Sequence, residues 1–297
     1  MKLNLVGPFI VNAPFGTEIA FAKGLRRRGH EVVEVDPNIT VDNLDRDADA
    51  TVVFKSCVGK ESVLVGLKHP VVVYQPDDAR FHHIREMMLN MRAYSTLFLS
   101  FDDHGATVAK SMGYRAAETL LLTADDELYC PSPEPIVRDI DVSFIGSMSD
   151  THAHASRRKM MQIVGNHGTK LGWNLWFENS QNIEHVRDIY RRSKVVLNHA
   201  TDVGQPFGKG YGLQCRHFEV AMTKTPILSN EPYGSTFPEL NFPCYNDESS
   251  LLRLTTVFVE TPNAVRVIGD DLYEQVIEKH MPEHRADALV SFITRNS

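Results

Sequence analysis

The sequence predicts an α/β protein of two domains, each with a parallel sheet flanked by helices. Three observations lead to this prediction. The chain has 297 residues, which is long for one domain and comfortable for two. A strand–loop–helix pattern that opens near residue 3 returns near residue 141. Between them, Pro131, Pro133 and Pro135 favour an extended linker. We therefore predict a first domain over residues 1–137 and a second over residues 138–297.

The first domain opens with a βαβ unit. Residues 3–6 form an apolar strand, a helix follows from Thr17 to Arg28 with Gly29 as its C-terminal cap, and residues 31–35 form the next strand. Short apolar runs at 51–54, 71–74 and 96–100, separated by helical patterns, are typical of buried parallel strands. Residues 120–122 close the domain. Because no G-x-G-x-x-G follows the first strand, a Rossmann dehydrogenase is disfavoured.

The second domain repeats this arrangement. Strands are expected at 141–145, 173–177, 195–197, 227–228 and 244–245, with helices from about Ala155, over 183–192 and over 213–224. Asn246 or Asp247 is expected to cap the helix that follows residue 245. The last fifty residues read as helices broken at Pro262 and Pro282.

The composition excludes several classes of protein. The chain carries 31 Lys and Arg against 38 Asp and Glu, a net charge of −7, so it lacks the basic excess of a protein held mainly by nucleic-acid phosphates. Its four cysteines are far apart, as in a reduced cytoplasmic protein, and no run is long and apolar enough for a membrane span. We therefore expect a cytoplasmic location.

The stretch from 197 to 230 is the best candidate for a binding site. An apolar run leads into a loop with Gly204, Gly208, Gly210 and Gly212, and a helix follows. Such a loop lets backbone N–H groups approach a ligand, and the positive end of the helix points the same way. Arg216 in the first helical turn suits a diphosphate, and Glu219, three residues on, suits ribose hydroxyls. The alternative is a surface loop before a helix whose charges face water.

Polar residues also follow two strands of the first domain, as Gln75-Pro76-Asp77-Asp78 and Phe101-Asp102-Asp103-His104. Ligands of open α/β sheets bind beyond these strand ends, so an acceptor or a catalytic base is one interpretation. The other is that the acids cap the next helices. Three histidine groups, His82-His83, His104 and His152-x-His154, lack the spacing of a zinc site, and we predict no metal.

Several segments, taken in order, resemble the CgeB-like (spore-maturation type) glycosyltransferases. More broadly, they are similar to group-1 transferases of the GT-B fold. They are Asp141 to Ser147 followed by Arg157; Tyr190-x-x-Ser193 to Asn198; Arg216-x-Phe218-Glu219; Pro226-Ile227-Leu228; Cys244 to Glu248; and Tyr273 to Phe292. The resemblance covers roughly residues 125–292.

The resemblance implies a GT-B fold: two Rossmann-like domains around a cleft, with the final helix crossing back to the first domain. It also implies that the second domain binds the donor and that neither a metal nor a cofactor is needed. The donor-binding residues would be Gly146, Ser147, Asn198, Lys209, Gly210, Gly212, Arg216, Glu219 and Tyr245. Phe15 and Gly16 resemble the acceptor-side loop of such enzymes, although an ordinary βα turn explains them as well.

Two positions depart from the family pattern. Tyr211 stands where group-1 transferases carry the acid that contacts the donor sugar, and Lys224 stands where a helix-ending glycine is usual. The donor sugar and the stereochemistry of transfer therefore stay open. Basic residues also crowd the start of the helix near Ala155, as Arg157, Arg158 and Lys159. Anion attraction and a solvated basic face explain this crowding equally well.

We predict a glycosyltransferase that moves a sugar from a nucleoside diphosphate, more readily UDP than others, to an acceptor. Arg216 would stabilise the leaving diphosphate, and Asp77, Asp78 and His104 are candidate bases if the enzyme inverts. A small molecule, a glycan, a protein and a modified DNA base are all open as acceptor. The alternatives are a phage-type DNA-base glycosyltransferase acting on a modified pyrimidine and a non-catalytic nucleotide-sugar-binding relative. The oligomeric state is not predicted.

Overall fold

The chain folds into two compact units, Met1–Asp125 with Met281–Ser297, and Asp126–His280. The structure is a computed structural model. It describes residues 1–7, 9, 16–36, 43–55, 61–77, 79–149, 154–179, 182–199, 210–230, 232–233 and 240–296. The predicted boundary between residues 137 and 138 stays a prediction, while packing divides the chain at Asp125 and again at His280.

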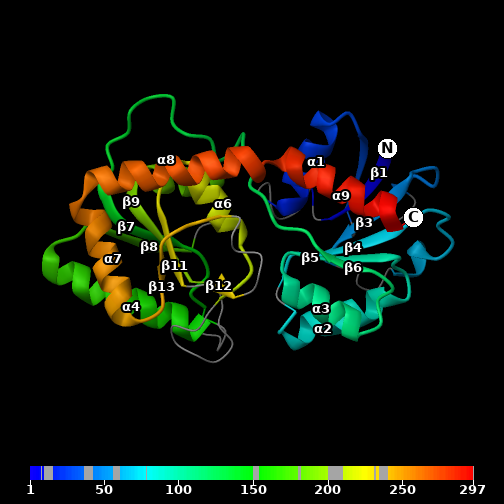
Figure 1. Cartoon of the computed structure of the whole chain (residues 1–297), viewed down its shortest axis with the longest axis horizontal. Helices are drawn as coiled ribbons and strands as arrows, with labels where there is room; N and C mark the ends of the chain where they lie inside the picture. Colours follow the sequence, from blue (N-terminus) through cyan, green and yellow to red (C-terminus); the bar gives the residue numbers. More distant parts are fainter. Residues whose placement is uncertain are drawn as a thin grey trace. The chain divides into compact units, whose positions relative to one another are not determined.

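The first unit contains a parallel sheet with the order β2-β1-β3-β4-β5-β6 (Figure 1). Valine-rich runs form its central strands, as expected of strands covered on both faces. The strands are β1 (Lys2–Val6), β2 (Glu31–Val35), β3 (Ala50–Phe54), β4 (Val71–Gln75), β5 (Leu97–Ser100) and β6 (Ala117–Thr119). The helices are α1 (Thr17–Arg27), α2 (His82–Arg92), α3 (Asp103–Ser111) and α9 (Pro282–Asn296), with the short 3₁₀ turn η2 (Glu61–Leu64).

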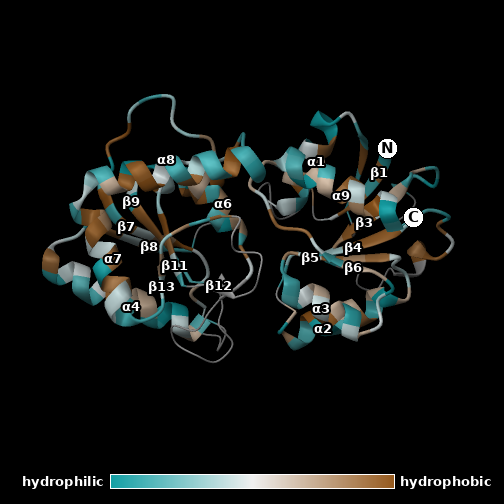
Figure 2. Cartoon of the chain, in the orientation of Figure 1, coloured by the Kyte–Doolittle hydropathy of each residue, from teal (hydrophilic) through white to brown (hydrophobic). Residues whose placement is uncertain are grey.

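The second unit contains a parallel sheet with the order β13-β11-β9-β7-β8. Its strands are β7 (Ile140–Ile145), β8 (Leu175–Glu178), β9 (Ser193–Asn198), β11 (Ile227–Asn230) and β13 (Cys244–Tyr245), and β10 (Gly210–Tyr211) pairs separately with β12 (Pro232–Tyr233). The helices are α4 (Ala155–Leu171), α5 (Ile183–Arg192), α6 (Cys215–Met222), α7 (Glu248–Glu260) and α8 (Pro262–Lys279). In both units hydrophobic residues dominate the strands and alternate with polar ones along the helices (Figure 2).

The sequence signals for helix ends are largely confirmed. Asp247 caps α7 and accepts a 2.6 Å hydrogen bond from the backbone N–H of Ser250. Asp102 caps α3 in the same way, with the N–H of Gly105 at 2.7 Å. Gly29 follows the C-cap of α1 with φ +78°, a backbone conformation that glycine adopts without strain.

The last helix, α9, belongs to the first unit, as the fold prediction requires. It lies beside α1 (Figure 1), and the approach is so close that a Cβ atom on Gly24 would overlap the backbone carbonyl of Pro282. Arg285 donates a 3.0 Å hydrogen bond to the carbonyl of Leu122. The chain therefore completes its first unit with its final segment. Of the described helices, none combines the length and the apolar character needed to cross a membrane.

Candidate functional site

The carboxyl edge of the second sheet has a topological switch point between β7 and β9. The chain leaves β7 through α4 to reach β8 on one side, and it leaves β9 through α6 to reach β11 on the other. In open α/β sheets, ligands bind in the crevice that such divergent connections leave. The predicted residues Gly146 and Ser147 follow β7 directly, and Asn198 ends β9. The topology therefore brings these three residues to one place.

Arg216 is held at this point by the first turn of α6. Its Nη1 atom donates a 2.8 Å hydrogen bond to Oδ1 of Asn198, and its guanidinium carbon lies 5.0 Å from the centre of the Phe144 ring. The Nε atom is buried without a hydrogen-bond partner among the described residues. The side chain thus has a fixed position and an unused donor.

A second guanidinium, that of Arg157, lies on the same Phe144 ring at 5.5 Å. It comes from α4, and only 7% of the residue is exposed. Its two terminal nitrogens donate to the backbone carbonyls of Ser147 at 2.7 Å and His199 at 3.0 Å. Burial, together with the charge of Arg216, lowers the pKa of Arg157 to about 9. The interpretation of a solvated basic face is therefore wrong for Arg157.

Neither guanidinium has a carboxylate within ion-pair distance among the residues that the structure describes. Two like charges held near each other cost free energy, most of all at Arg157, because this buried guanidinium has lost water without an ion-pair partner among the described residues. A bound anion offsets that cost. The arrangement therefore favours a ligand with at least one negative charge beside Phe144.

Gly146 leaves the space that Arg216 occupies. A Cβ atom at this position would lie 2.5 Å from Nη2 of Arg216 and 3.3 Å from the Phe144 ring. Gly212, between β10 and α6, has φ +69°, which is a conformation that glycine adopts without a side-chain clash. Glycine is needed at both places for local geometric reasons. Lys209 and the other loop glycines before Gly210 lie outside the described residues.

Glu219 lies one turn after Arg216 on α6 and is partly buried. Burial raises the pKa of its carboxyl group to about 7, and the charge of Arg216 opposes that rise. Burial also raises the pKa of the Tyr190 hydroxyl to about 12, with Glu219 adding to the rise. The ring of Tyr190 stacks on that of Tyr129 at 6.3 Å. A carboxyl group that ionises near neutral pH is thus available beside the arginine.

A buried hydrogen-bond network supports the site from below. The Nδ2 atom of Asn198 donates to the hydroxyl of Ser229 at 2.9 Å, and Nε2 of His217 lies 3.3 Å from the same hydroxyl. Burial lowers the pKa of His217 to about 3, so the imidazole is neutral at physiological pH. The Tyr245 hydroxyl donates to the backbone carbonyl of Asn198 at 3.0 Å. Tyr245 therefore supports the strand end from within the core.

The candidates in the first unit lie beyond the carboxyl ends of its strands. Asp77, after β4, pairs with Lys55 at 3.1 Å, and His104 is the second residue of α3. The capping interpretation holds for Asp102, which is the N-cap of α3. Gly16 is the N-cap of α1, and a Cβ atom there would overlap the Glu18 carboxylate. Phe15 and Asp78 lie outside the described residues.

Glu18 is a buried acid that the sequence analysis did not identify. It lies in the first turn of α1, and burial raises its pKa, while the charge of Lys55 opposes the rise. An acid in a first helical turn is common, so the sequence carries no signal that separates this one from an ordinary dipole-stabilising residue. Among the described residues no cluster of metal-ligating side chains is present, and His152 is not described.

Comparisons with known proteins identify the fold class. A family model described as glycosyl transferase-like matches residues 147–291. No curated protein matches the sequence. Among solved structures, an α-glucosyltransferase in complex with UDP and a 13-mer DNA containing an HMU base superimposes with a TM-score of 0.70 at 12% identity, covering 99% of each chain.

Two other solved structures are similar over the whole chain. A glycosyltransferase involved in avilamycin A biosynthesis has a TM-score of 0.66 at 14% identity, covering 99% of this chain and 97% of its own. A trehalose-6-phosphate synthase has a TM-score of 0.66 at 9% identity, covering 99% of each chain. The predicted GT-B fold is thus confirmed. The family match over residues 147–291 is to a glycosyl transferase-like model, while the narrower CgeB-like assignment stays a prediction.

Proposed function

We propose that this protein is a glycosyltransferase that takes a sugar from a nucleoside diphosphate donor of the UDP type. The observation that carries the proposal is the pair of guanidinium groups of Arg157 and Arg216. They come from the two helices, α4 and α6, that connect the strands at the switch point, and neither has a carboxylate within ion-pair distance among the described residues. A diphosphate supplies the missing negative charge and matches the hydrogen-bonding geometry of guanidinium groups. The N-terminal end of α6 adds its positive field at the same place.

The chemistry follows from where charge develops. When the bond between the sugar and the diphosphate breaks, the leaving group gains negative charge. Cations that are already in position stabilise that charge without reorganising. Asn198 and Phe144 hold Arg216 in place, and the backbone carbonyls of Ser147 and His199 hold Arg157. Because fixed guanidiniums provide this stabilisation, the proposed reaction needs neither a metal nor a cofactor.

The remaining donor contacts are proposals on the same basis. Glu219, when ionised, would accept hydrogen bonds from ribose hydroxyls. Gly146, Gly210 and Gly212 would let the backbone approach the donor, and Lys209 would add a mobile charge. We place the donor in residues 138–297 and the acceptor in residues 1–137, with Phe15 and Gly16 in the acceptor-side loop. Asp77, Asp78 and His104 are the proposed bases for an inverting reaction.

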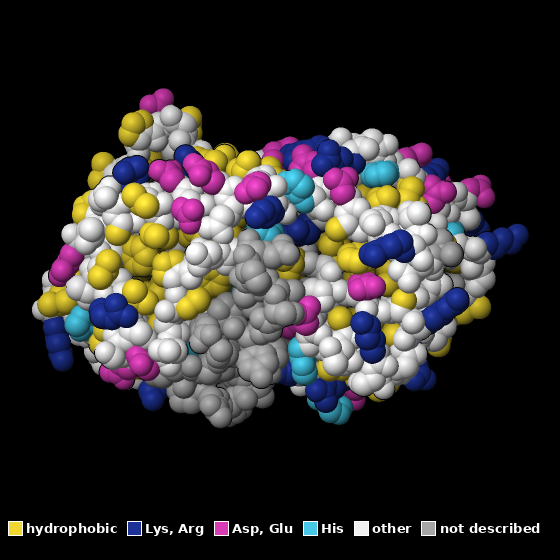
Figure 3. All heavy atoms as spheres, in the orientation of Figure 1, with side chains coloured by type: hydrophobic (Ala, Val, Ile, Leu, Met, Phe, Trp, Pro, Cys, Tyr) yellow, Lys and Arg dark blue, Asp and Glu magenta, His cyan; other side chains and the backbone are white. Residues whose placement is uncertain are grey.

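A DNA acceptor is the second candidate, because the DNA-bound α-glucosyltransferase is among the structural neighbours. The charge distribution does not favour it. The net charge is −7, and on the described part of the face in Figure 3 basic and acidic side chains are intermixed. Binding to duplex DNA with an HMU base, weakening steeply as salt rises, would support a DNA acceptor. Equal binding to unmodified DNA would count against it.

The decisive experiment is a titration with UDP by calorimetry, with Arg216→Ala and the matched control Arg253→Ala, an exposed arginine on α7. Loss of one charge-assisted contact of about 1.5–3 kcal/mol predicts UDP binding roughly 10- to 100-fold weaker in Arg216→Ala, and wild-type binding in the control. Equal affinity in both variants would overturn the assignment. Slow hydrolysis of a UDP-sugar without acceptor separates an enzyme from a non-catalytic binding protein.

A further inference from the structure

A basic pocket lies at the amino edge of the second sheet, opposite the edge that holds Arg216. It has a volume of about 420 Å³ and is lined by Arg138, Lys194, Lys224, Pro262, Val265, Arg266 and Asp270. Arg138 precedes β7, Lys194 lies at the start of β9 and Lys224 precedes β11. Each of three parallel strands therefore has one cationic residue at this edge of the sheet. Two carboxylates contact three of these four cations: Lys194 pairs with Asp141 at 2.5 Å, and Lys224 and Arg266 share Asp270. The cations still outnumber the carboxylates, so the pocket carries a net positive charge.

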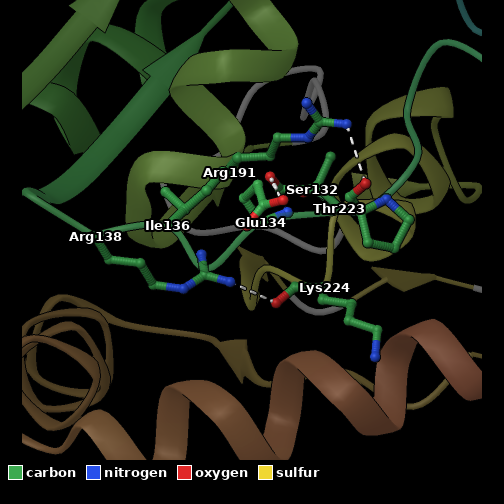
Figure 4. Close-up of a pocket in the computed structure, with 8 residues that line it drawn as sticks. Ser132, Glu134, Ile136, Arg138, Arg191, Thr223 and Lys224 are labelled. Carbon is green, nitrogen blue, oxygen red and sulfur yellow. Dashed lines mark hydrogen bonds between the residues drawn. The ribbon is translucent and has the colours of Figure 1, made fainter.

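Arg138 is fixed at the back of this pocket. Its guanidinium donates to the hydroxyl of Thr225 at 2.9 Å and to the backbone carbonyl of Lys224 at 2.8 Å, as Figure 4 shows for the second contact. No carboxylate lies within ion-pair distance of it among the described residues. A smaller pocket of about 140 Å³ shares Arg138 and Lys224 and adds Arg191 and Glu134 (Figure 4).

Lys224 has an unusual backbone conformation. Its φ is +57°, at the position after the C-cap of α6 where glycine is the common choice. A residue with a side chain is strained there. The α8 helix also presses on this turn, because a Cβ atom on Gly269 would overlap the Lys224 carbonyl. The chain therefore keeps a lysine where glycine would fit the backbone better.

The side-chain contacts of Lys224 do not explain why a lysine is kept. Its ammonium group pairs with Asp270 at 3.2 Å and lies 4.8 Å from the centre of the Tyr273 ring. The Lys224 side chain is 42% exposed and the Asp270 side chain 39% exposed, and ion pairs at such exposed positions add little stability. Strain that is retained without a matching gain in stability points to a functional role.

We propose that this pocket is a second binding site, for a small phosphorylated molecule, held by Lys224, Arg266, Lys194 and Arg138. The volume lies in the range of small-molecule sites. Phosphate suits a site where four cations share two carboxylates, and Pro262 and Val265 offer an apolar wall for the rest of the ligand. The first turn of α8 begins at Pro262 and adds its positive field. This site is independent of the proposed glycosyl transfer, since the two use different edges of the sheet.

The test is calorimetry with inorganic pyrophosphate at low ionic strength. Because Arg216 would also bind this probe, the titration uses Arg216→Ala protein, alone and with a second change. Adding Lys224→Gly should weaken the remaining binding about 10- to 100-fold, while adding Lys170→Gln, an exposed lysine of α4, should leave it unchanged. Arg266→Gln should weaken it as well. In the otherwise wild-type protein, Lys224→Gly should remove one of two binding components.

A stability measurement separates binding from a merely structural role. Because glycine fits φ +57° without strain, Lys224→Gly should melt within about 4 °C of the wild type, the shift that corresponds to roughly 1 kcal/mol. Lys224→Arg, which keeps the cation, should retain the binding. The proposal is overturned if Arg216→Ala alone abolishes pyrophosphate binding, or if Lys224→Gly binds as tightly as Lys170→Gln.

Discussion

Arg216 and Asn198 are joined by a 2.8 Å hydrogen bond, from Nη1 to Oδ1, that ties the start of α6 to the end of β9. The amide cannot easily turn over, because its Nδ2 atom donates to Ser229 at 2.9 Å. Its oxygen therefore faces the guanidinium. An amide oxygen orients a cation without cancelling its charge, whereas a carboxylate would cancel it. The site is thus held in position and stays positive.

Replacing Asn198 with Asp tests this distinction. A carboxylate of almost the same shape beside Arg216 would supply the counter-charge that we assign to the ligand. We expect Asn198→Asp to bind UDP at least about tenfold more weakly, a loss of about 1.4 kcal/mol or more. Asn166→Asp, on an exposed position of α4, makes the same change in net charge and should bind normally. Calorimetry that finds the two variants alike would argue against a diphosphate at Arg216.

Replacing Gly146 with Ala tests whether the placement of Arg216 matters. The new methyl group would lie 2.5 Å from Nη2, so the guanidinium must move. We expect UDP affinity to fall about tenfold, and to fall no further when the change is made in an Arg216→Ala background. Gly165→Ala is the control, because its Cβ atom would meet its nearest neighbour at 3.9 Å. Additive effects of the two changes would contradict the mechanism.

The raised pKa of Glu219 predicts that the free energy of unfolding depends on pH. This pKa is about 7 in the folded chain against an ordinary value of 4.5, so the unfolded chain loses this proton first. The free energy of unfolding should therefore fall by up to about 3 kcal/mol as the pH rises from about 4.5 to about 7, and then level off. Glu219→Gln should lack this fall. Urea unfolding at pH 5 and pH 8 measures the difference, and parallel changes in both proteins would contradict the prediction.

Replacing Gly24 with Ala tests the packing of α9 on α1. The methyl group would overlap the Pro282 carbonyl, and a backbone atom cannot yield as a side chain does. We expect the free energy of unfolding of the first unit to fall by about 1–3 kcal/mol. Both tryptophans, Trp173 and Trp176, belong to the second unit, so their fluorescence serves as an internal reference while circular dichroism follows both units. An unchanged dichroism transition would contradict the prediction.

Much of the fold could be predicted because local signals agree with tertiary packing. Apolar runs gave the buried strands, Asp247 capped its helix, and α8 and α9 begin at Pro262 and Pro282. The prediction was less accurate where signals are short. The edge strand β6 has three residues and no apolar run. The α6 helix is shorter than predicted at both ends, because Gln214 caps it and Lys224 turns out of it.

The site was predictable where neighbours in sequence act together, and less so elsewhere. The glycine loop, Arg216 and Glu219 belong to one stretch, whereas Gly146 and Asn198 were predicted only through the family resemblance. Arg157 was noticed, but the sequence does not tell whether a basic residue at a helix start faces water or the Phe144 ring. The hydrogen bond between Arg216 and Asn198 spans eighteen residues, and the ring that both arginines share lies on a third element. Such relations depend on the tertiary fold.

The return of α9 to α1 has a consequence for synthesis on the ribosome. Residues 1–125 emerge first, yet their unit lacks a helix until residues 281–297 have left the exit tunnel. The part of α1 that packs against α9, at Gly24, stays uncovered while residues 126–280 are translated. A nascent chain whose residues up to 280 have left the tunnel, with 281–297 still inside, should therefore hold a completed second unit and an unfinished first unit.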